Sequence, residues 1–206
     1  MSGNKTASII CGAPDGRLDK SLVEGLVICA DSGLDHALDA GIAPDIVVGD
    51  FDSSKAEIPD GSECIRVSPI KDDTDTILAA DTAIERGCTQ LRFFCALGGR
   101  FDHAFANVQM LEYLHEKGVS AVLYGGNESL RLLFSGDTAR LLRHGGFVSV
   151  FSLTEEAVVS ERGMKYELSH HTLKRSFPLG VSNEITADCG EITVHSGAVI
   201  LYEYTT

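Results

Sequence analysis

The chain has 206 residues, 44% of them hydrophobic, and its 17 basic and 30 acidic side chains give a formal charge of −13. This length allows one large domain or two small ones, and the apolar content excludes general disorder. The charge disfavours nonspecific binding to nucleic acid or anionic lipid, and no apolar run approaches the roughly 20 residues of a membrane span.

The first 125 or so residues alternate between apolar runs and helical patterns. Strands are expected at 7–12, 26–30, 46–48, 64–67, 91–97 and 121–124. Three helices are expected between them, ending at Gly41, near Gly87 and at Gly118, because a glycine commonly ends a helix. Strands that alternate with helices are typical of an α/β domain on a mostly parallel sheet.

From about Asn127 the helical periodicity fades, and short β-type runs follow one another between turn signals. The runs expected to form strands are 130–134, 139–142, 147–153, 158–160, 192–195 and 199–204. Such a pattern is typical of a β-sandwich or barrel. The sequence therefore predicts a Rossmann-like three-layer α/β/α domain over 1–128 and a β-rich domain over 129–206.

Two carboxylates, Asp50 and Asp52, follow the predicted strand at 46–48. Ligand sites in open α/β sheets lie beyond the carboxyl ends of the strands. Residues two apart in an extended chain point the same way, so this pair can share a hard cation such as Mg²⁺. The alternative interpretation is an ordinary turn, because Gly, Asp and Ser are common turn residues.

Polar clusters also follow other predicted strands of the first domain. They are Asp31-Ser32-Gly33, Lys71-Asp72-Asp73-Thr74-Asp75 and Arg100 with Asp102-His103. Strand ends of one parallel sheet lie side by side, so these clusters are expected to converge with Asp50 and Asp52. A structural alternative is that Asp31 and Asp73 are helix N-caps. Crowded carboxylates repel one another, and a bound cation would relieve that repulsion.

Arg100 follows Gly98 and Gly99, whose missing side chains allow a ligand to approach the backbone. Its guanidinium matches phosphate oxygens. His103 is either a phosphate donor or a helix-start residue, and Lys71 reaches either a phosphate or the acids beside it. There is no Gly-x-x-x-x-Gly-Lys-Ser/Thr loop and no protein-kinase motif set. The residues alone indicate a metal-dependent enzyme that handles a polyphosphate.

The six cysteines include no Cys-x-x-Cys pair, and most lie in or beside apolar strands. We interpret them as reduced core residues, and zinc is not expected. The N-terminal residues have no signal-peptide pattern. Together these features predict a cytoplasmic protein.

In this order, the motifs resemble those of the thiamine pyrophosphokinase family. The matching pieces are Ala30-Asp31-Ser32-Gly33, Pro44-Asp45, Gly49-Asp50-Phe51-Asp52-Ser53, Lys71-Asp72-Asp73-Thr74-Asp75, Gly98-Gly99-Arg100-Phe101-Asp102-His103 and Gly180-Val181-Ser182-Asn183-Glu184. They span nearly the whole chain. The resemblance implies a homodimeric enzyme that transfers pyrophosphate from Mg-ATP to the hydroxyl of thiamine, giving thiamine diphosphate and AMP.

The resemblance also implies roles for single residues. Asp50, Asp52 and Asp75 would hold Mg²⁺, and Asp52, Asp75, Arg100 and Asp102 would be the catalytic residues. Asp31, Lys71, Asp72, Arg100 and Asp102 would surround the nucleotide and its phosphates, with His103 beside them. Ser182 and Asn183 would bind thiamine. The chain has no Trp, which some family members use near thiamine, so another residue must stack on the thiamine rings.

Two alternatives stay open. A different Mg²⁺-dependent phosphohydrolase or nucleotide transferase that uses Asp50 and Asp52 would release phosphate or consume a sugar nucleotide. A non-catalytic acidic module would bind Ca²⁺ or Mg²⁺ without ATP. Identification of the reaction products separates all three.

Overall fold

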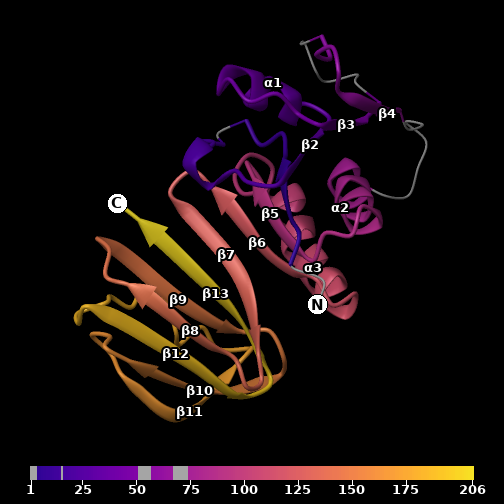
Figure 1. Cartoon of the computed structure of the whole chain (residues 1–206). Helices are drawn as coiled ribbons and strands as arrows, with labels where there is room; N and C mark the ends of the chain where they lie inside the picture. The colour runs from indigo at the N-terminus through magenta and orange to yellow at the C-terminus, as the bar shows by residue number, and fades with distance from the viewer. Residues whose placement is uncertain (1–3, 15, 51–56, 67–73) are drawn as a thin grey trace. The chain divides into compact units, whose positions relative to one another are not determined.

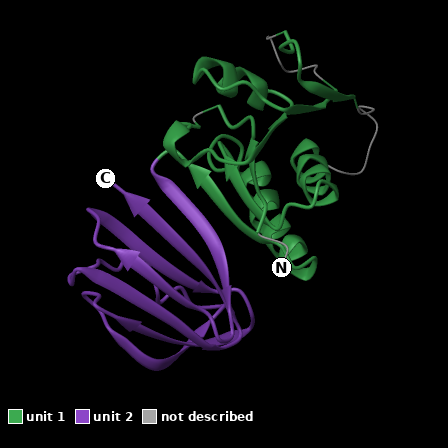
Figure 2. Cartoon of the chain, viewed as in Figure 1, with its two compact units in different colours: residues 1–126 green, residues 127–206 purple. Residues whose placement is uncertain are grey.

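The computed structural model describes residues 4–14, 16–50, 57–66 and 74–206. Two compact units make up the chain, residues 1–126 and 127–206 (Figure 2). The predicted site residues Asp52, Lys71 and Asp72 lie outside the described residues. None of the helices in the described part of the chain has the length and apolar character that a membrane span requires.

The first unit is built on a parallel sheet (Figure 1). Its elements are β1 (Thr6–Ile10), the 3-10 helix η1 (Lys20–Leu22), β2 (Leu26–Ala30), α1 (Gly33–Asp39), β3 (Ile46–Gly49), β4 (Glu63–Arg66), α2 (Asp75–Glu85), β5 (Gln90–Phe94), α3 (Phe101–Glu116) and β6 (Ser120–Gly125). The strands lie in the order β4-β3-β2-β1-β5-β6, and each neighbouring pair is parallel. The expectation of an α/β domain with a mostly parallel sheet is confirmed.

The strand order of this sheet reverses between β1 and β5. From β1 the chain steps through β2 and β3 to β4 on one side, and it then places β5 and β6 on the other side. The connections after β1 and β5 therefore leave in opposite directions. Open α/β sheets bind ligands in the crevice that this divergence creates. The crevice is expected just beyond Ile10 and Phe94, where β1 and β5 end.

Side chains on aligned strands alternate between the two faces of the sheet, and a helix covers each face. α1 packs on a face formed by Ile10, Cys29 and Val47, which lie side by side on β1, β2 and β3. Successive side chains of a strand point to opposite faces, so the residues one position earlier face away from α1. α2, whose Ala79 and Ala80 are fully buried, lies across the same three strands on that second face (Figure 1).

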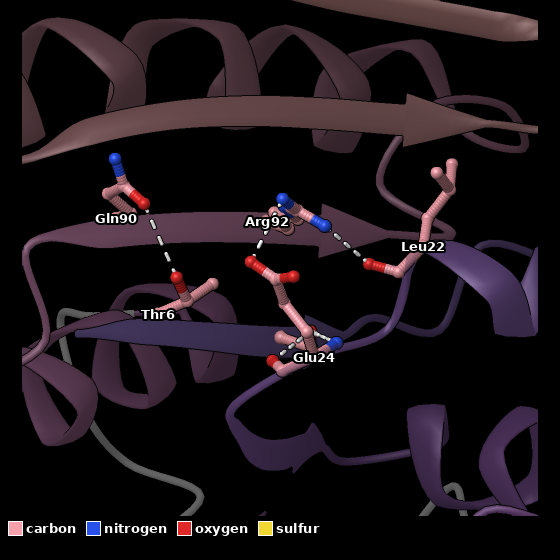
Figure 3. Close-up of polar contacts among 6 residues, drawn as sticks. Thr6, Leu22, Glu24, Gln90 and Arg92 are labelled. Atoms are coloured by element: carbon pink, nitrogen blue, oxygen red, sulfur yellow. Dashed lines mark hydrogen bonds and ion pairs between the residues drawn. The ribbon is translucent and has the colours of Figure 1, made fainter. Parts of the chain in front are cut away.

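Polar side chains fix the segment that leads into β2 (Figure 3). The buried hydroxyl of Ser8 on β1 accepts the N–H of Glu24 at 3.0 Å and donates to its carbonyl at 2.8 Å. Arg92 on β5 pairs with the Glu24 carboxylate at 3.0 Å and donates to the Leu22 carbonyl at 2.7 Å. These contacts hold the segment against β1 and β5 and set where β2 begins.

The second unit is all β. Its strands are β7 (Glu128–Phe134), β8 (Thr138–Leu142), β9 (Gly146–Ser152), β10 (Glu156–Arg162), β11 (Leu168–Lys174), β12 (Cys189–Ser196) and β13 (Ala198–Thr205). β7, β13 and β9 pair in that order, and β11, β10, β12 and β8 form a separate four-stranded sheet. Their pairings are antiparallel. Side chains from both sets, including Val148, Val159, Ile192 and Leu201, form one core, as expected for a β-sandwich.

Candidate active site

A cavity of about 610 Å³ opens in the first unit at the reversal of strand order. Its wall comes from the segments that follow β1, β2 and β5 and from the first turns of α2 and α3. These segments all lie beyond the carboxyl ends of the strands, where the fold is expected to bind a ligand. The volume falls in the range of small-molecule sites.

Predicted site residues from three sequence segments meet in this cavity. Asp31 follows β2, Asp75 begins α2, and Arg100, Asp102 and His103 stand at the start of α3. The cavity thus brings together the acidic and basic side chains that the sequence pattern expected to converge.

Asp50 follows β3 and is half-buried. Among the predicted site residues of the first unit that the structure describes, Asp50 alone does not line the cavity wall. The adjoining Gly49 lies close to Asp31, because a Cβ on Gly49 would come within 3.1 Å of the Asp31 Cα. The end of β3 is therefore next to the end of β2. Within the described ranges, no three Asp, Glu, His or Cys side chains form a cluster suited to a metal ion.

The interpretation of Asp31 as a helix N-cap is wrong, and Asp73 lies outside the described residues. Ser32 is the N-cap of α1, and Thr74 is the N-cap of α2, where its hydroxyl accepts the Ile77 N–H at 3.3 Å. Asp31 instead directly follows β2 and has the left-handed backbone conformation, with φ 46°. Residues other than glycine rarely adopt this conformation, and such strain often accompanies function.

The two glycines before Arg100 are required by the backbone conformation of the turn and also leave room for a ligand. Gly98 and Gly99 have φ values of 101° and 64°, which only glycine adopts readily. A Cβ on Gly99 would also lie only 2.8 Å from the side chain of Pro14, which is too close. The turn that delivers Arg100 to the cavity thus depends on glycine.

Arg100 and Asp102 form a two-pronged ion pair. The Arg100 Nε donates to Asp102 Oδ1 at 3.1 Å, and Nη2 donates to Oδ2 at 2.6 Å. The pKa of Asp102 is lowered below its ordinary value, mainly by the hydrogen bonds from Arg100. Both side chains are exposed, so water screens the pair and it stabilises the fold little. A phosphate can therefore replace the Asp102 carboxylate on the guanidinium.

The thiols in the cavity wall are unreactive. Burial raises the pKa of Cys11 to about 12 and that of Cys95 to about 11. Thiols nucleophilic at neutral pH have lowered pKa values, so these two are small apolar wall residues. Neither thiol has the lowered pKa of a nucleophilic cysteine.

Asn107 is a cavity residue that the sequence did not single out. Its Nδ2 donates to the carbonyl of Ala96 at 2.8 Å, which ties α3 to the loop after β5. A residue in the middle of a helix carries no local signal of such a contact, because its partner is set by tertiary packing.

The predicted thiamine-binding residues lie in the second unit. Ser182 is exposed, has a left-handed backbone with φ 58°, and donates its N–H to the Ser149 hydroxyl at 3.0 Å. Asn183 is only 7% exposed and pairs with Val148 on β9 as an isolated antiparallel bridge. The two neighbours therefore differ: Ser182 faces solvent, and Asn183 is part of the packed interior.

The amide of Asn183 has all its hydrogen-bonding capacity in use. Its Oδ1 accepts the N–H groups of Tyr166 and Glu184, each at 3.0 Å. Its Nδ2 donates to the Tyr166 carbonyl and to the Glu161 carboxylate, each at 2.8 Å. A side-chain amide offers two donors and two acceptor sites. Asn183 uses all four to organise its neighbours, so no donor or acceptor remains for a ligand.

Tyr166 is a second residue that sequence reasoning missed. Asn183 fixes both its N–H and its carbonyl, while 65% of the residue stays exposed. An exposed aromatic ring on a fixed backbone is a suitable platform for a flat ligand. The fixing contact joins residues 17 positions apart, so no local motif reveals it.

Comparisons with known proteins agree along the whole chain. The family model described as "Thiamin pyrophosphokinase, catalytic domain" matches residues 20–123, and that described as "Thiamin pyrophosphokinase, vitamin B1 binding domain" matches residues 138–201. A thiamine pyrophosphokinase of Bacillus subtilis is 28% identical over 226 aligned positions, which cover 98% of this chain and 99% of that protein.

Solved structures give the same result. The crystal structure of thiamine pyrophosphokinase from Bacillus subtilis has a TM-score of 0.88 and 26% identity, covering 98% of this chain and all of that one. The thiamin pyrophosphokinase of Geobacillus thermodenitrificans has a TM-score of 0.84 and 25% identity, with 98% of each chain covered. The yeast enzyme, at 14% identity and a TM-score of 0.76, shares the fold, covering 99% of this chain and 87% of its own. The resemblance stated from the sequence is confirmed, and the chain belongs to the thiamin pyrophosphokinase family.

Proposed function

We propose that the first-unit cavity binds ATP and that the chain transfers the terminal diphosphate of ATP to the hydroxyl of thiamine. The observation that carries the proposal is the convergence of Asp31, Asp75, Arg100, Asp102 and His103 on one cavity at the reversal of a parallel sheet. In this proposal residues 1–128 hold the nucleotide and catalyse the transfer, and residues 129–206 bind thiamine and form a homodimer. A cytoplasmic location is part of the same proposal.

Magnesium fits the donors that this site offers. Carboxylate oxygens are the protein ligands that Mg²⁺ prefers, and Asp31, Asp75 and Asp102 all line the cavity. We assign Asp75 in the cavity wall, Asp50 at the end of the neighbouring β3, and Asp52, which lies outside the described residues, as the residues that would hold the ion. When bound, Mg²⁺ supplies charge neutralisation to the phosphate oxygens.

The proposed reaction needs no enzyme-bound intermediate. The thiamine hydroxyl oxygen bonds to the β-phosphorus, the bond from that phosphorus to the α,β-bridging oxygen breaks, and AMP leaves with the electron pair. The hydroxyl proton passes to a carboxylate of the site or to water. Arg100 exchanges the Asp102 carboxylate for phosphate oxygens, while Lys71, Asp72 and His103 surround the phosphates. Positioning and charge stabilisation provide most of the rate.

Thiamine, a flat cation, suits the second-unit surface around Tyr166. The Tyr166 ring offers a π face to a positive charge and takes the place of the missing tryptophan. Exposed Ser182 contacts the substrate, and Asn183 contributes by holding the Tyr166 backbone in place. In this proposal Ser182 contacts thiamine, and Asn183 positions Tyr166 without contacting thiamine.

The products distinguish this function from its alternatives. Protein incubated with ATP, Mg²⁺ and thiamine should yield equal amounts of thiamine diphosphate and AMP. Free phosphate would indicate a phosphohydrolase, and cation binding without turnover would indicate a non-catalytic module. Either result would reject the proposed function.

A further inference from the structure

Glu161 places a carboxylate inside the second unit. It lies on β10, is 2% exposed, and accepts one hydrogen bond, from Asn183 Nδ2 at 2.8 Å. Within the part of the chain that the structure describes, Glu161 has no ion-pair partner. Charged side chains are seldom buried without a counter-charge, so this one calls for a physical explanation.

Packing and hydrogen bonding do not explain the charge. Burial raises the pKa of Glu161, and the hydrogen bond from Asn183 reverses only part of that rise. A glutamine has nearly the same shape, and its carbonyl oxygen accepts the same hydrogen bond without a buried charge. The fold would therefore be served at least as well by an amide at this position.

The position of the carboxylate suggests what the charge does. Asn183 Nδ2 donates both to Glu161 and to the Tyr166 carbonyl, so the carboxylate lies behind the backbone that carries the exposed Tyr166 ring. Protein atoms separate the carboxylate from water. A charge in such surroundings acts more strongly on a nearby ligand than a surface charge does.

We propose that Glu161 determines specificity for a positively charged ring: its buried carboxylate, held behind Tyr166 by Asn183, favours the thiazolium cation of thiamine over a neutral ring of the same shape. The inference rests on the proposed function, since it takes the surface around Tyr166 as the thiamine site. Glu161 acts without touching the substrate, through charge and through the residue that positions Tyr166.

Several of the other charged groups near Glu161 form ion pairs, and the ammonium of Lys165 also lies 5.8 Å from the centre of the Tyr166 ring. The charged and titratable side chains on the adjoining elements are Glu156, Arg162, Lys165, Tyr166, Glu167, His170, His171, Lys174, Glu184, Cys189, Glu191 and His195. Lys165 pairs with Glu184 at 2.6 Å, and Glu191 pairs with Arg140 at 3.2 Å. A pH experiment must therefore compare the native protein with a Glu161 variant.

The experiment uses the full chain and a pair of ligands that differ in charge. In 3-deazathiamine a neutral thiophene replaces the thiazolium, while the aminopyrimidine and the hydroxyethyl group are unchanged. Dissociation constants for both ligands are measured by calorimetry at pH 7.5 for the native protein and for Glu161→Gln, which keeps the hydrogen bond to Asn183. A matched control, Glu191→Gln, removes a carboxylate that is paired with Arg140 on the adjoining strand.

We expect Glu161→Gln to weaken thiamine binding by about tenfold or more and to change 3-deazathiamine binding by less than about twofold. The control should leave the ratio of the two constants unchanged. An equal weakening of both ligands would mean that Glu161 is only structural, and an unchanged ratio would mean that its charge has no role; either result overturns the inference. If the native protein forms no thiamine diphosphate, the proposed function fails instead.

A second measurement needs no variant that might fold poorly. The native preference for thiamine over 3-deazathiamine should decrease as the pH falls from 7.5 into the acidic range, because protonation of Glu161 removes the charge that selects the cation. The thiazolium cation lowers the basicity of the aminopyrimidine in thiamine but not in 3-deazathiamine, so the protonation of each free ligand is measured separately and corrected for before the ratio is taken. A pH-independent preference in the native protein overturns the inference, as does a pH dependence that Glu161→Gln retains.

Discussion

Replacement of Asn183 by alanine should destabilise the second unit far more than a typical polar substitution. The change removes four hydrogen bonds and leaves the buried Glu161 carboxylate, together with two N–H groups and one carbonyl that are partly buried, without these partners. A hydrogen bond contributes about 1 kcal/mol net, and a buried charged group left without a partner costs more. We therefore expect a loss of about 4 to 5 kcal/mol in the free energy of unfolding of this unit.

Asn107→Ala is the matched control. The same atoms are removed, but Asn107 makes one side-chain hydrogen bond, at 2.8 Å, and it stands within α3. Alanine is a better helix former than asparagine by about 0.5 kcal/mol, which offsets part of the lost bond. The expected net loss for the control is below about 1 kcal/mol.

Urea denaturation followed by circular dichroism measures both losses, and hydrogen exchange locates them. After Asn183→Ala, the backbone amides of Tyr166 and Glu184 should exchange faster, because each has lost its acceptor. If Asn183→Ala and Asn107→Ala destabilise the protein by the same small amount, the reasoning from buried hydrogen bonds is wrong.

Three further predictions concern other contacts. Tyr113→Phe should lower stability by about 1 kcal/mol in urea denaturation, because the hydroxyl of Tyr113 joins α3 to Asp81 on α2 at 2.9 Å; an unchanged stability would contradict this. Glu161→Gln should raise the melting temperature at pH 7 and lose this advantage toward pH 4. Because burial raises the pKa of Glu161, this residue favours folding at pH values below the ordinary pKa of a glutamate, and that contribution is lost as the pH rises through the pKa of Glu161 in the folded protein. A change in melting temperature that does not depend on pH would contradict this prediction. Arg100→Lys should lower turnover by about 10²-fold or more, because lysine keeps the charge and loses the two-pronged geometry; a loss below tenfold in a steady-state assay would reduce Arg100 to a general charge.

The sequence predicted the parallel sheet and the first-unit cavity because both follow from local patterns and one topological rule. Apolar runs followed by Asp31, Asp75 or Arg100 are visible in the chain, and parallel strands bring their carboxyl ends to one edge. The chemistry of the cavity could therefore be anticipated without coordinates. The alternative interpretation of Asp31 as an N-cap failed because Asp31 stands one residue before the actual cap, Ser32, and cap residue types alone do not fix a helix start to one position.

The features that the sequence did not predict depend on contacts between distant residues. β11 (Leu168–Lys174) was missed because it is an edge strand with one buried side chain, Leu173, and it therefore lacks the alternating apolar pattern. The cluster of Glu161, Tyr166 and Asn183 was missed because it joins β10, a turn and an isolated bridge across 22 positions. Polar networks of this kind become visible only when the fold places their members together.

The transfer of an intact diphosphate group is the central claim, and labelled ATP tests it most directly. ATP that carries ³²P in the γ position is incubated with the protein, Mg²⁺ and thiamine, and the products are separated over time. We predict that the label passes directly into thiamine diphosphate at the same rate as AMP forms, without thiamine monophosphate or ADP as an intermediate. Label released as free phosphate, or thiamine monophosphate formed together with ADP, would contradict the account.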